Sequence, residues 1–204
     1  MIVANHVSWL DIYALNAICP ARFVAKSEIG RWPLIGLFAR QCGTVFIDRA
    51  RRRDILRVNA LLTALLREGT TVAVFPEGTT SVGDTVLPFR PPLLQSAVAC
   101  DARLQAVAIR YENADGSPCR HASFVGDTTF GATLWLVMKQ PTIHAHLAFL
   151  PPLQCSGESR KRLARTTERD IANVIERPET TRLPPAPANR HRVEELLAAT
   201  QVPG

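Results

Sequence analysis

The chain has 204 residues, 47% of them apolar, and a formal net charge of +6, a balance typical of one globular domain with a substantial core. It contains no run of 18 apolar residues and opens without a basic segment, which argues against a transmembrane helix and a secretory signal peptide. The five cysteines are widely spaced and lack a C-x-x-C pair. We therefore expect a reducing compartment, without a disulfide framework or a zinc site.

The 24 basic residues outnumber the 18 acidic ones, and a basic surface attracts polyanions such as nucleic acid or an anionic membrane leaflet. The chain lacks the signatures of an RNA-recognition motif, a zinc finger or a helix-turn-helix. Charge alone leaves both partners open, so the sequence motifs must decide between them.

Short apolar runs alternate with helical patterns in the first half of the chain. The apolar runs predict strands at residues 2–4, 22–25, 44–47 and 71–75. Between them we expect helices at residues 8–18, 34–38 and 55–66. Ser8 is the expected N-cap of the first helix, with Asp11 three residues on, and Pro20 ends it. Gly69 is the expected stop of the third helix.

The second half continues the pattern, with strands expected at 104–111 and 143–150 and helices at 91–100 and 158–177. Repeated strand–helix–strand units predict an α/β fold: a single domain whose mixed, largely parallel sheet is flanked by helices. We assign residues 1–178 to this domain and 179–204 to a flexible tail rich in proline and arginine. We also expect that a segment is missing before the first strand.

His6 and Asp11 form an H-x4-D motif at the start of the first predicted helix. Removing the proton of a hydroxyl nucleophile requires a base, and a neutral histidine suits this task near pH 7. A carboxylate assists by fixing the tautomer of the histidine. A side chain in the first turn tends to reach back toward the cap, so Asp11 and His6 can meet. An isolated H-x4-D is, however, more typical of a loop histidine beside a capping aspartate.

Two further motifs follow predicted strands, where open α/β sheets bind ligands. Arg49 offers a planar fork of donors to phosphate oxygens, unless it joins the arginines that follow it at a solvated helix start. In the later motif, Gly78 lets the backbone approach a ligand closely. There Thr79 can donate to oxygens, and Glu77 can accept from a glycerol-like hydroxyl.

The order and spacing of these motifs resemble the signature boxes of the glycerolipid and lysophospholipid acyltransferases, of the 1-acylglycerol-3-phosphate acyltransferase (PlsC) type. The matching boxes are His6-Val7-Ser8-Trp9-Leu10-Asp11, Gly43-Thr44-Val45-Phe46-Ile47-Asp48-Arg49 and Phe75-Pro76-Glu77-Gly78-Thr79. The resemblance implies a catalytic base at His6 oriented by Asp11. It implies acceptor or phosphate binding by Arg49, Glu77, Gly78 and Thr79, with supporting roles for Lys26, Ser8 and Arg90.

The implied reaction moves a fatty acyl chain from acyl-CoA or acyl-carrier protein to the free hydroxyl of a lysophospholipid. The simplest acceptor is 1-acyl-sn-glycerol-3-phosphate, which gives phosphatidic acid, and neither a metal nor a cofactor is implied. The implied partners are these substrates and a membrane surface, not nucleic acid. The implied location is the cytoplasmic face of a bacterial inner membrane, held peripherally or through the missing N-terminal segment.

Two departures keep other functions open. Many family members carry Arg where this chain has Thr80, and Pro where it has Ala106. Acylation of another lysolipid, such as lyso-ornithine lipid, is therefore an alternative. A lipid-binding module without catalysis is a second alternative.

Two other features have ordinary interpretations. His144 and His146 alternate along a predicted strand and are interpreted as an exposed face rather than as metal ligands, since no third ligand is evident. The apolar segments 32–35 and 134–138 are expected in the core. A tryptophan in one of them could instead contact a membrane interface.

Overall fold

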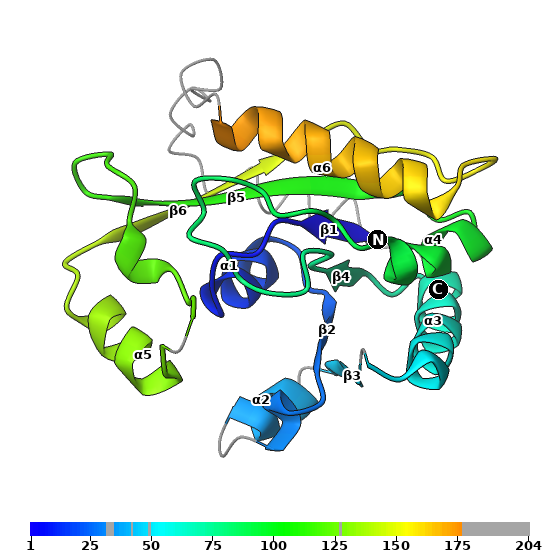
Figure 1. The fold of residues 1–204 in the computed structure, drawn as a ribbon, viewed down its shortest axis with the longest axis horizontal. Coiled ribbons are helices and arrows are strands. Elements are labelled where there is room, and N and C mark those ends of the chain that lie inside the picture. Colours follow the sequence, from blue (N-terminus) through cyan, green and yellow to red (C-terminus); the bar gives the residue numbers. More distant parts are fainter. Residues whose placement is uncertain (32–34, 42, 49, 127, 177–204) are drawn as a thin grey trace, which may run out of the picture.

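The computed structural model describes residues 1–31, 35–41, 43–48, 50–126 and 128–176 (Figure 1). Six strands form one sheet in the order β3-β2-β4-β1-β5-β6. They span Ile2–Ala4 (β1), Arg22–Lys26 (β2), Val45–Ile47 (β3), Val72–Val74 (β4), Gln105–Asn113 (β5) and Ile143–Phe149 (β6). β6 pairs antiparallel with β5, and the other neighbouring strands are parallel. The predicted α/β fold with a mixed, largely parallel sheet is confirmed.

The helices connect these strands. The α-helices are α1 (Leu10–Ile18), α2 (Ile35–Gln41), α3 (Arg52–Arg67), α4 (Gln95–Ala99), α5 (Phe130–Met138) and α6 (Arg160–Glu176). Short 3-10 turns are η1 (Ile29–Arg31), η2 (Pro91–Leu94) and η3 (Arg120–Ala122). Gly69, after α3, has a φ of 80°, a left-handed conformation that suits glycine at a helix stop. The domain boundary expected at residue 178 and the tail 179–204 lie outside the described residues.

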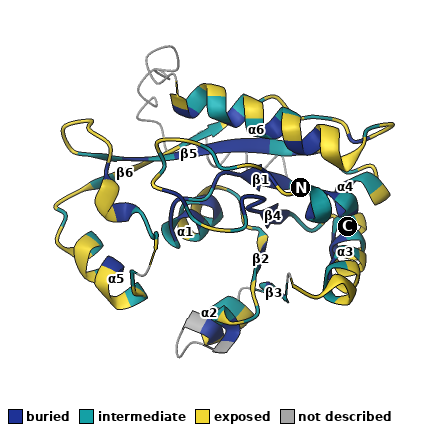
Figure 2. Cartoon of the chain, viewed as in Figure 1, coloured by how far each residue is buried: buried dark blue, intermediate teal, exposed yellow. Residues whose placement is uncertain are grey.

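Each face of the sheet has its own apolar core, because successive strand residues point to opposite faces. Val3 packs in the cluster that α3, α4 and α6 cover. Ile2 and Ala4 pack in the other cluster, together with Leu15 of α1 and Ala122 of η3. Figure 2 shows the central strands buried between these layers. The layered arrangement fixes the strand ends, which is what positions the site.

The chemical motifs all follow the carboxyl ends of parallel strands. His6 comes two residues after β1, and Phe75 comes directly after β4, which is the neighbour of β1 in the sheet. Lys26 is the last residue of β2. Ligands bind at this edge in open α/β sheets, so the topology gathers the motifs as the sequence predicts.

Three local expectations differ from the structure. The Ser8 hydroxyl makes no hydrogen bond among the described residues, and Trp9 occupies the N-cap position of α1. The helix expected at 91–100 begins as the 3-10 turn η2, with α4 following it. The segment expected in the core at 134–138 belongs to α5, where Trp135 and Met138 are exposed. The other apolar segment, at 32–35, falls largely outside the described residues.

Candidate active site

His6 and Asp11 are in direct contact. The Nδ1 atom of His6 lies 2.7 Å from Oδ2 of Asp11, whose side chain is fully buried. Oδ2 also accepts the backbone N–H groups of Val7 at 2.8 Å and Ser8 at 3.0 Å. Asp11 lies in the first turn of α1, so its side chain reaches back to the free amides before the helix. The reach-back expected of Asp11 is therefore present, although the Ser8 hydroxyl does not act as a cap.

This contact sets the chemistry of the imidazole. When Nδ1 carries the hydrogen and donates it to Asp11, Nε2 is left as the acceptor. One face of the ring is also covered, because it stacks on Phe75 with 4.0 Å between ring centroids and an interplanar angle of 11°. His6 thus has one fixed orientation and one nitrogen free to take a proton.

Tyr111, near the end of β5, holds the second oxygen of Asp11. Its hydroxyl donates to Oδ1 at 2.8 Å. Burial, together with the charge of Asp11, raises the pKa of Tyr111 far above its usual value, so the phenol stays protonated. Sequence reasoning missed this residue. The sequence shows only a tyrosine at the end of an apolar predicted strand, and such a tyrosine can equally well be a core residue.

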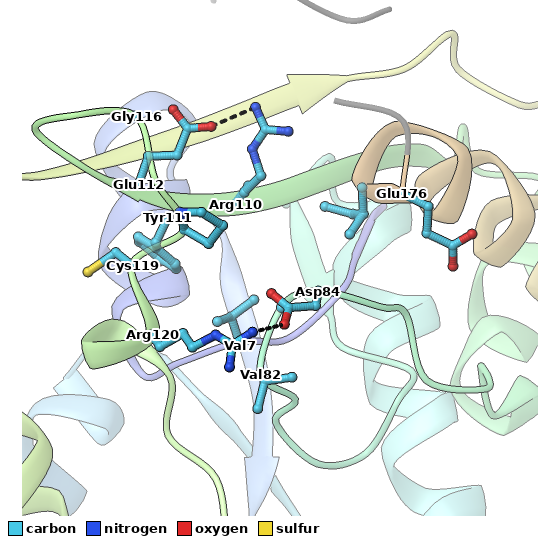
Figure 3. A pocket seen from close by; sticks show the side chains of 13 residues that line it. Val7, Val82, Asp84, Arg110, Tyr111, Glu112, Gly116, Cys119, Arg120 and Glu176 are labelled. Atoms are coloured by element: carbon cyan, nitrogen blue, oxygen red, sulfur yellow. Dashed lines mark hydrogen bonds and ion pairs between the residues drawn. The ribbon is translucent and has the colours of Figure 1, made fainter. Parts of the chain in front are cut away.

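Tyr111 also lines a cavity of about 320 Å³. Figure 3 shows residues that line it, among them Tyr111 and Val7, together with the Arg120–Asp84 and Arg110–Glu112 ion pairs. His6 is not among the residues that line it.

Glu77 ties the loop after β4 to the loop after β1. Its Oε1 accepts the backbone N–H of His6 at 2.9 Å, and the N–H of Ser81 donates to the carbonyl of His6 at 2.8 Å. Burial raises the pKa of Glu77 to about 7, and the amide of His6 opposes this shift only in part. Its Oε2 is buried without a hydrogen-bond partner among the described residues.

An apolar cavity of about 310 Å³ opens at His6, and we name it the His6 cavity. Gly78 and Thr79 line it next to His6, and Lys26 lines it from the end of β2. Glu28 and Thr80 are the other polar residues of the lining, and the remaining walls are apolar: Trp9, Ile12, Phe23, Val24, Ala25, Ile29, Phe75, Phe124 and Phe130. Its size and largely apolar lining suit one hydrocarbon chain.

The remaining predicted site residues are placed differently. Arg90 is exposed and lines a smaller cavity of about 150 Å³ with Ile47 and Phe75, and it is not among the residues that line the His6 cavity. Ser8 contributes its backbone amide to Asp11, but its hydroxyl contributes nothing visible. Arg49 lies outside the described residues. Thr80, which stands where many relatives carry arginine, donates its hydroxyl to the carbonyl of Phe124.

Within the described ranges, no group of three or more His, Cys, Asp or Glu side chains could hold a metal ion. None of the helices described there is both long and apolar enough to cross a bilayer. His146 is half exposed and pairs with Glu112 at 2.9 Å, which agrees with the exposed face predicted for it.

Known proteins share this fold and these motifs. A family model described as Acyltransferase matches residues 1–110. The chain is 37% identical to the 1-acyl-sn-glycerol-3-phosphate acyltransferase of Neisseria meningitidis serogroup B, over 86% of this chain and 69% of that protein. It is also 37% identical to the lyso-ornithine lipid O-acyltransferase of Pseudomonas aeruginosa, over 83% of this chain and 65% of that protein.

A solved structure extends the comparison to the fold. The crystal structure of the 1-acyl-sn-glycerophosphate (LPA) acyltransferase, PlsC, from Thermotoga maritima matches with a TM-score of 0.60 and 24% identity. The match covers 89% of this chain and 66% of that one. The chain spans about two-thirds of the length of these relatives.

The fold is thus that of an α/β acyl-transfer enzyme. The chain belongs to the acyltransferase family, as its motifs predicted. The Neisseria and Pseudomonas relatives are named for different lysolipids. The comparisons therefore establish the family of this chain but not the lysolipid that it accepts.

Proposed function

We propose that this protein transfers a fatty acyl chain from a thioester to the free hydroxyl of a lysolipid, with His6 as the base. The observation that carries the proposal is the 2.7 Å contact between His6 Nδ1 and the buried Asp11, which leaves Nε2 available beside an apolar cavity. A base at the mouth of a chain-sized cavity suits a reaction between a hydroxyl and a long acyl group.

The reaction proceeds by direct attack. Nε2 of His6 takes the proton of the acceptor hydroxyl while the oxygen bonds to the thioester carbonyl carbon. Asp11 holds the ring and stabilises the imidazolium that forms. When the tetrahedral intermediate collapses, the carbon–sulfur bond breaks and the thiolate receives the proton from His6. The products are an ester and a free thiol, with no acyl-enzyme intermediate.

The loop after β4 positions the acceptor. Gly78 and Thr79 line the cavity beside His6, and Glu77 fixes the backbone of His6. Lys26 lies at the same cavity, where its positive charge suits the developing oxyanion. Arg49 remains the candidate for the acceptor phosphate on its chemistry alone. Arg90 lines a separate cavity, so we propose for it a role in binding the acceptor headgroup rather than in the chemistry.

The acceptor we propose first is 1-acyl-sn-glycerol-3-phosphate, on which the Neisseria relative acts by name. Lyso-ornithine lipid is the second candidate. The observation that favours it is Thr80, whose hydroxyl is engaged with the Phe124 carbonyl and supplies no cation to a phosphate. Acyl-CoA and acyl-carrier protein are the two candidate donors. The cytoplasmic face of a bacterial inner membrane is the location that fits such substrates.

The test is thiol release from palmitoyl-CoA, measured with and without each acceptor. We expect release that depends on the acceptor and falls at least about a thousandfold in His6→Ala and in Asp11→Asn, because the base or its orientation is lost. His144→Ala is the matched control, since His144 is an exposed histidine on β6, and its rate should equal that of wild type.

Retained turnover in either of the first two variants contradicts the assigned roles. A protein that binds lysolipid yet releases no thiol from palmitoyl-CoA or palmitoyl-acyl-carrier protein would be a lipid-binding module instead. The preferred acceptor is the one with the higher kcat/KM in the same assay.

A further inference from the structure

The helix α5 exposes its apolar side chains instead of burying them. Thr133 is its one buried residue. Trp135 is 57% exposed, Met138 is 61% exposed, and Leu136 is 37% exposed. Figure 1 shows α5 at the margin of the molecule, away from the sheet, and it packs against the short turn η3. Large apolar side chains gathered in this way mark an interaction surface rather than a folding core.

One end of α5 adjoins the His6 cavity. Phe130, the first residue of α5, lines the cavity. Its ring packs on Trp9, which also lines the cavity, at 5.1 Å between centroids. Tyr13 of α1, which is 62% exposed, meets Trp9 edge-on at 5.8 Å. Aromatic side chains of α1 and α5 are therefore in contact beside the cavity.

A lysine follows α5 directly. The helix itself carries no charged residue. The ammonium group of this lysine, Lys139, lies 5.0 Å from the centre of the Trp135 ring. The supporting turn η3 carries Arg120, which is 75% exposed although paired with Asp84. A tryptophan beside a lysine, with an arginine nearby, is typical of the boundary between lipid headgroups and acyl chains.

We propose that α5 lies in the interfacial layer of an anionic lipid bilayer and holds the mouth of the His6 cavity against that layer. Nine residues of helix extend about 14 Å, far short of the hydrocarbon thickness, so α5 lies along the surface rather than across it. Trp135 and Met138, which lie three residues apart on one side of the helix, enter the layer, and the ammonium group of Lys139 reaches the headgroups. The orienting role rests on the proposed function, because it brings lipid substrates to His6. The docking of α5 to a membrane does not depend on that function.

The occupant is lipid rather than a second copy of the chain for a chemical reason. Phe130 of α5 lines the His6 cavity, so a protein partner seated on α5 would crowd the site that must receive a lipid substrate. Basic residues at the margin match anionic headgroups.

The test is flotation of the purified protein with vesicles of equal parts phosphatidylglycerol and phosphatidylcholine. The test variant is Trp135→Gln with Met138→Gln. The matched control is Leu56→Gln with Leu61→Gln, which changes two exposed apolar residues of α3, 62% and 40% exposed. Gln leaves the net charge unchanged in both. We expect the α5 variant to lose vesicle binding on the order of tenfold or more, and the α3 variant to bind as wild type.

Further measurements separate the alternatives. His6→Ala should float as wild type does, so loss of transfer activity and loss of docking remain distinguishable. An unchanged thermal unfolding midpoint shows that the α5 variant is folded. Equal vesicle binding by wild type and the α5 variant overturns the proposal, as does a wild type that does not float. A wild-type dimer that the α5 changes convert to monomer, with flotation unaffected, assigns the surface to a second copy and overturns it too.

Discussion

Asp11 has no solvent exposure, and each of its two oxygens has defined donors. Oδ2 receives His6 and two backbone amides, whereas Oδ1 receives Tyr111 alone. When a buried carboxylate oxygen loses its hydrogen-bond donor, the cost of removing that oxygen from water is no longer offset. With His6 as the proposed base, we expect Tyr111 to be a positioning residue that acts through Asp11.

Tyr111→Phe tests this role. The change leaves Oδ1 unpaired, so Asp11 holds the ring of His6 less firmly, and its unshared negative charge favours the protonated ring in the free enzyme. We expect kcat to fall about ten- to a hundredfold because the ring is less well positioned, in line with a charged hydrogen bond of about 1.5–3 kcal/mol. The acidic limb of kcat/KM should move to higher pH, because His6 must be neutral to act as a base. Stopped assays across pH measure both. A loss of stability with an unshifted pH profile would leave Tyr111 only a packing role.

Glu77 gives a prediction about stability and pH. Its pKa is raised from 4.5 to about 7 in the folded protein, mainly by burial. Between these values the folded state binds more protons than the unfolded state, so the free energy of unfolding falls as pH rises from about 4.5 to 7. This difference between the two pKa values of Glu77 corresponds to about 3 kcal/mol in the free energy of unfolding.

Glu77→Gln removes this titration, so its stability should decline less than that of wild type between pH 5 and 8. Urea denaturation at several pH values measures the difference. Glu68→Gln is the control, since Glu68 is an exposed residue at the end of α3. Parallel curves for wild type and Glu77→Gln would show that Glu77 has no raised pKa in solution.

At the scale of elements, the Asn5 side chain, just after β1, makes the two hydrogen bonds to β5 that a strand backbone would make. Asn5 Nδ2 donates to the carbonyl of Ile109 at 2.9 Å, and the N–H of Ile109 donates to Asn5 Oδ1 at 2.7 Å. The side chain thus continues the pairing of β1 with β5, which frees the backbone at His6 to bond with the loop after β4.

Asn5→Ala should destabilise the fold by about 2–4 kcal/mol, because it leaves a buried N–H and a buried carbonyl unpaired. Activity should fall as well, since the backbone of His6 is no longer held in place. Urea denaturation and the thiol-release assay check the two effects. Asn59→Ala is the control, because Asn59 bonds one carbonyl within α3. A stability change no larger than that of Asn59→Ala would contradict the account.

The elements show which features the sequence could predict. Strands and amphipathic helices followed from periodicity, because burial on one face repeats along the chain: α3 buries Val58, Leu62 and Leu65 at helical spacing. The His6–Asp11 pair followed from local geometry at one helix start. The Tyr111 contact could not be predicted, because it joins positions 100 residues apart through the pairing of β1 and β5. The sequence could not decide between a buried and an exposed α5, because an apolar segment has the same composition whether protein or lipid covers it.

In the whole molecule, the parallel sheet brings together at one edge the motifs that lie far apart in the first half of the sequence. β1 and β4 are neighbours although Ile2 and Ala73 are far apart in sequence, so the loops after them meet at His6. The helix α5 extends that edge outward from the cavity. The chemistry and the proposed lipid-facing surface are thus parts of one side of the molecule.

The net charge of +6 should add an attraction to anionic membranes that is separate from the apolar contribution of α5. Raising ionic strength from about 0.05 to 0.5 M shortens the Debye length to a few ångströms. Binding of wild type to phosphatidylglycerol vesicles should therefore weaken, on the order of tenfold. The salt dependence should be the same in Trp135→Gln/Met138→Gln, because that variant changes no charge, while its affinity is lower at every salt concentration. Flotation across a salt series measures both. A variant whose salt dependence differs from that of wild type would mean that α5 also fixes how the basic residues meet the headgroups.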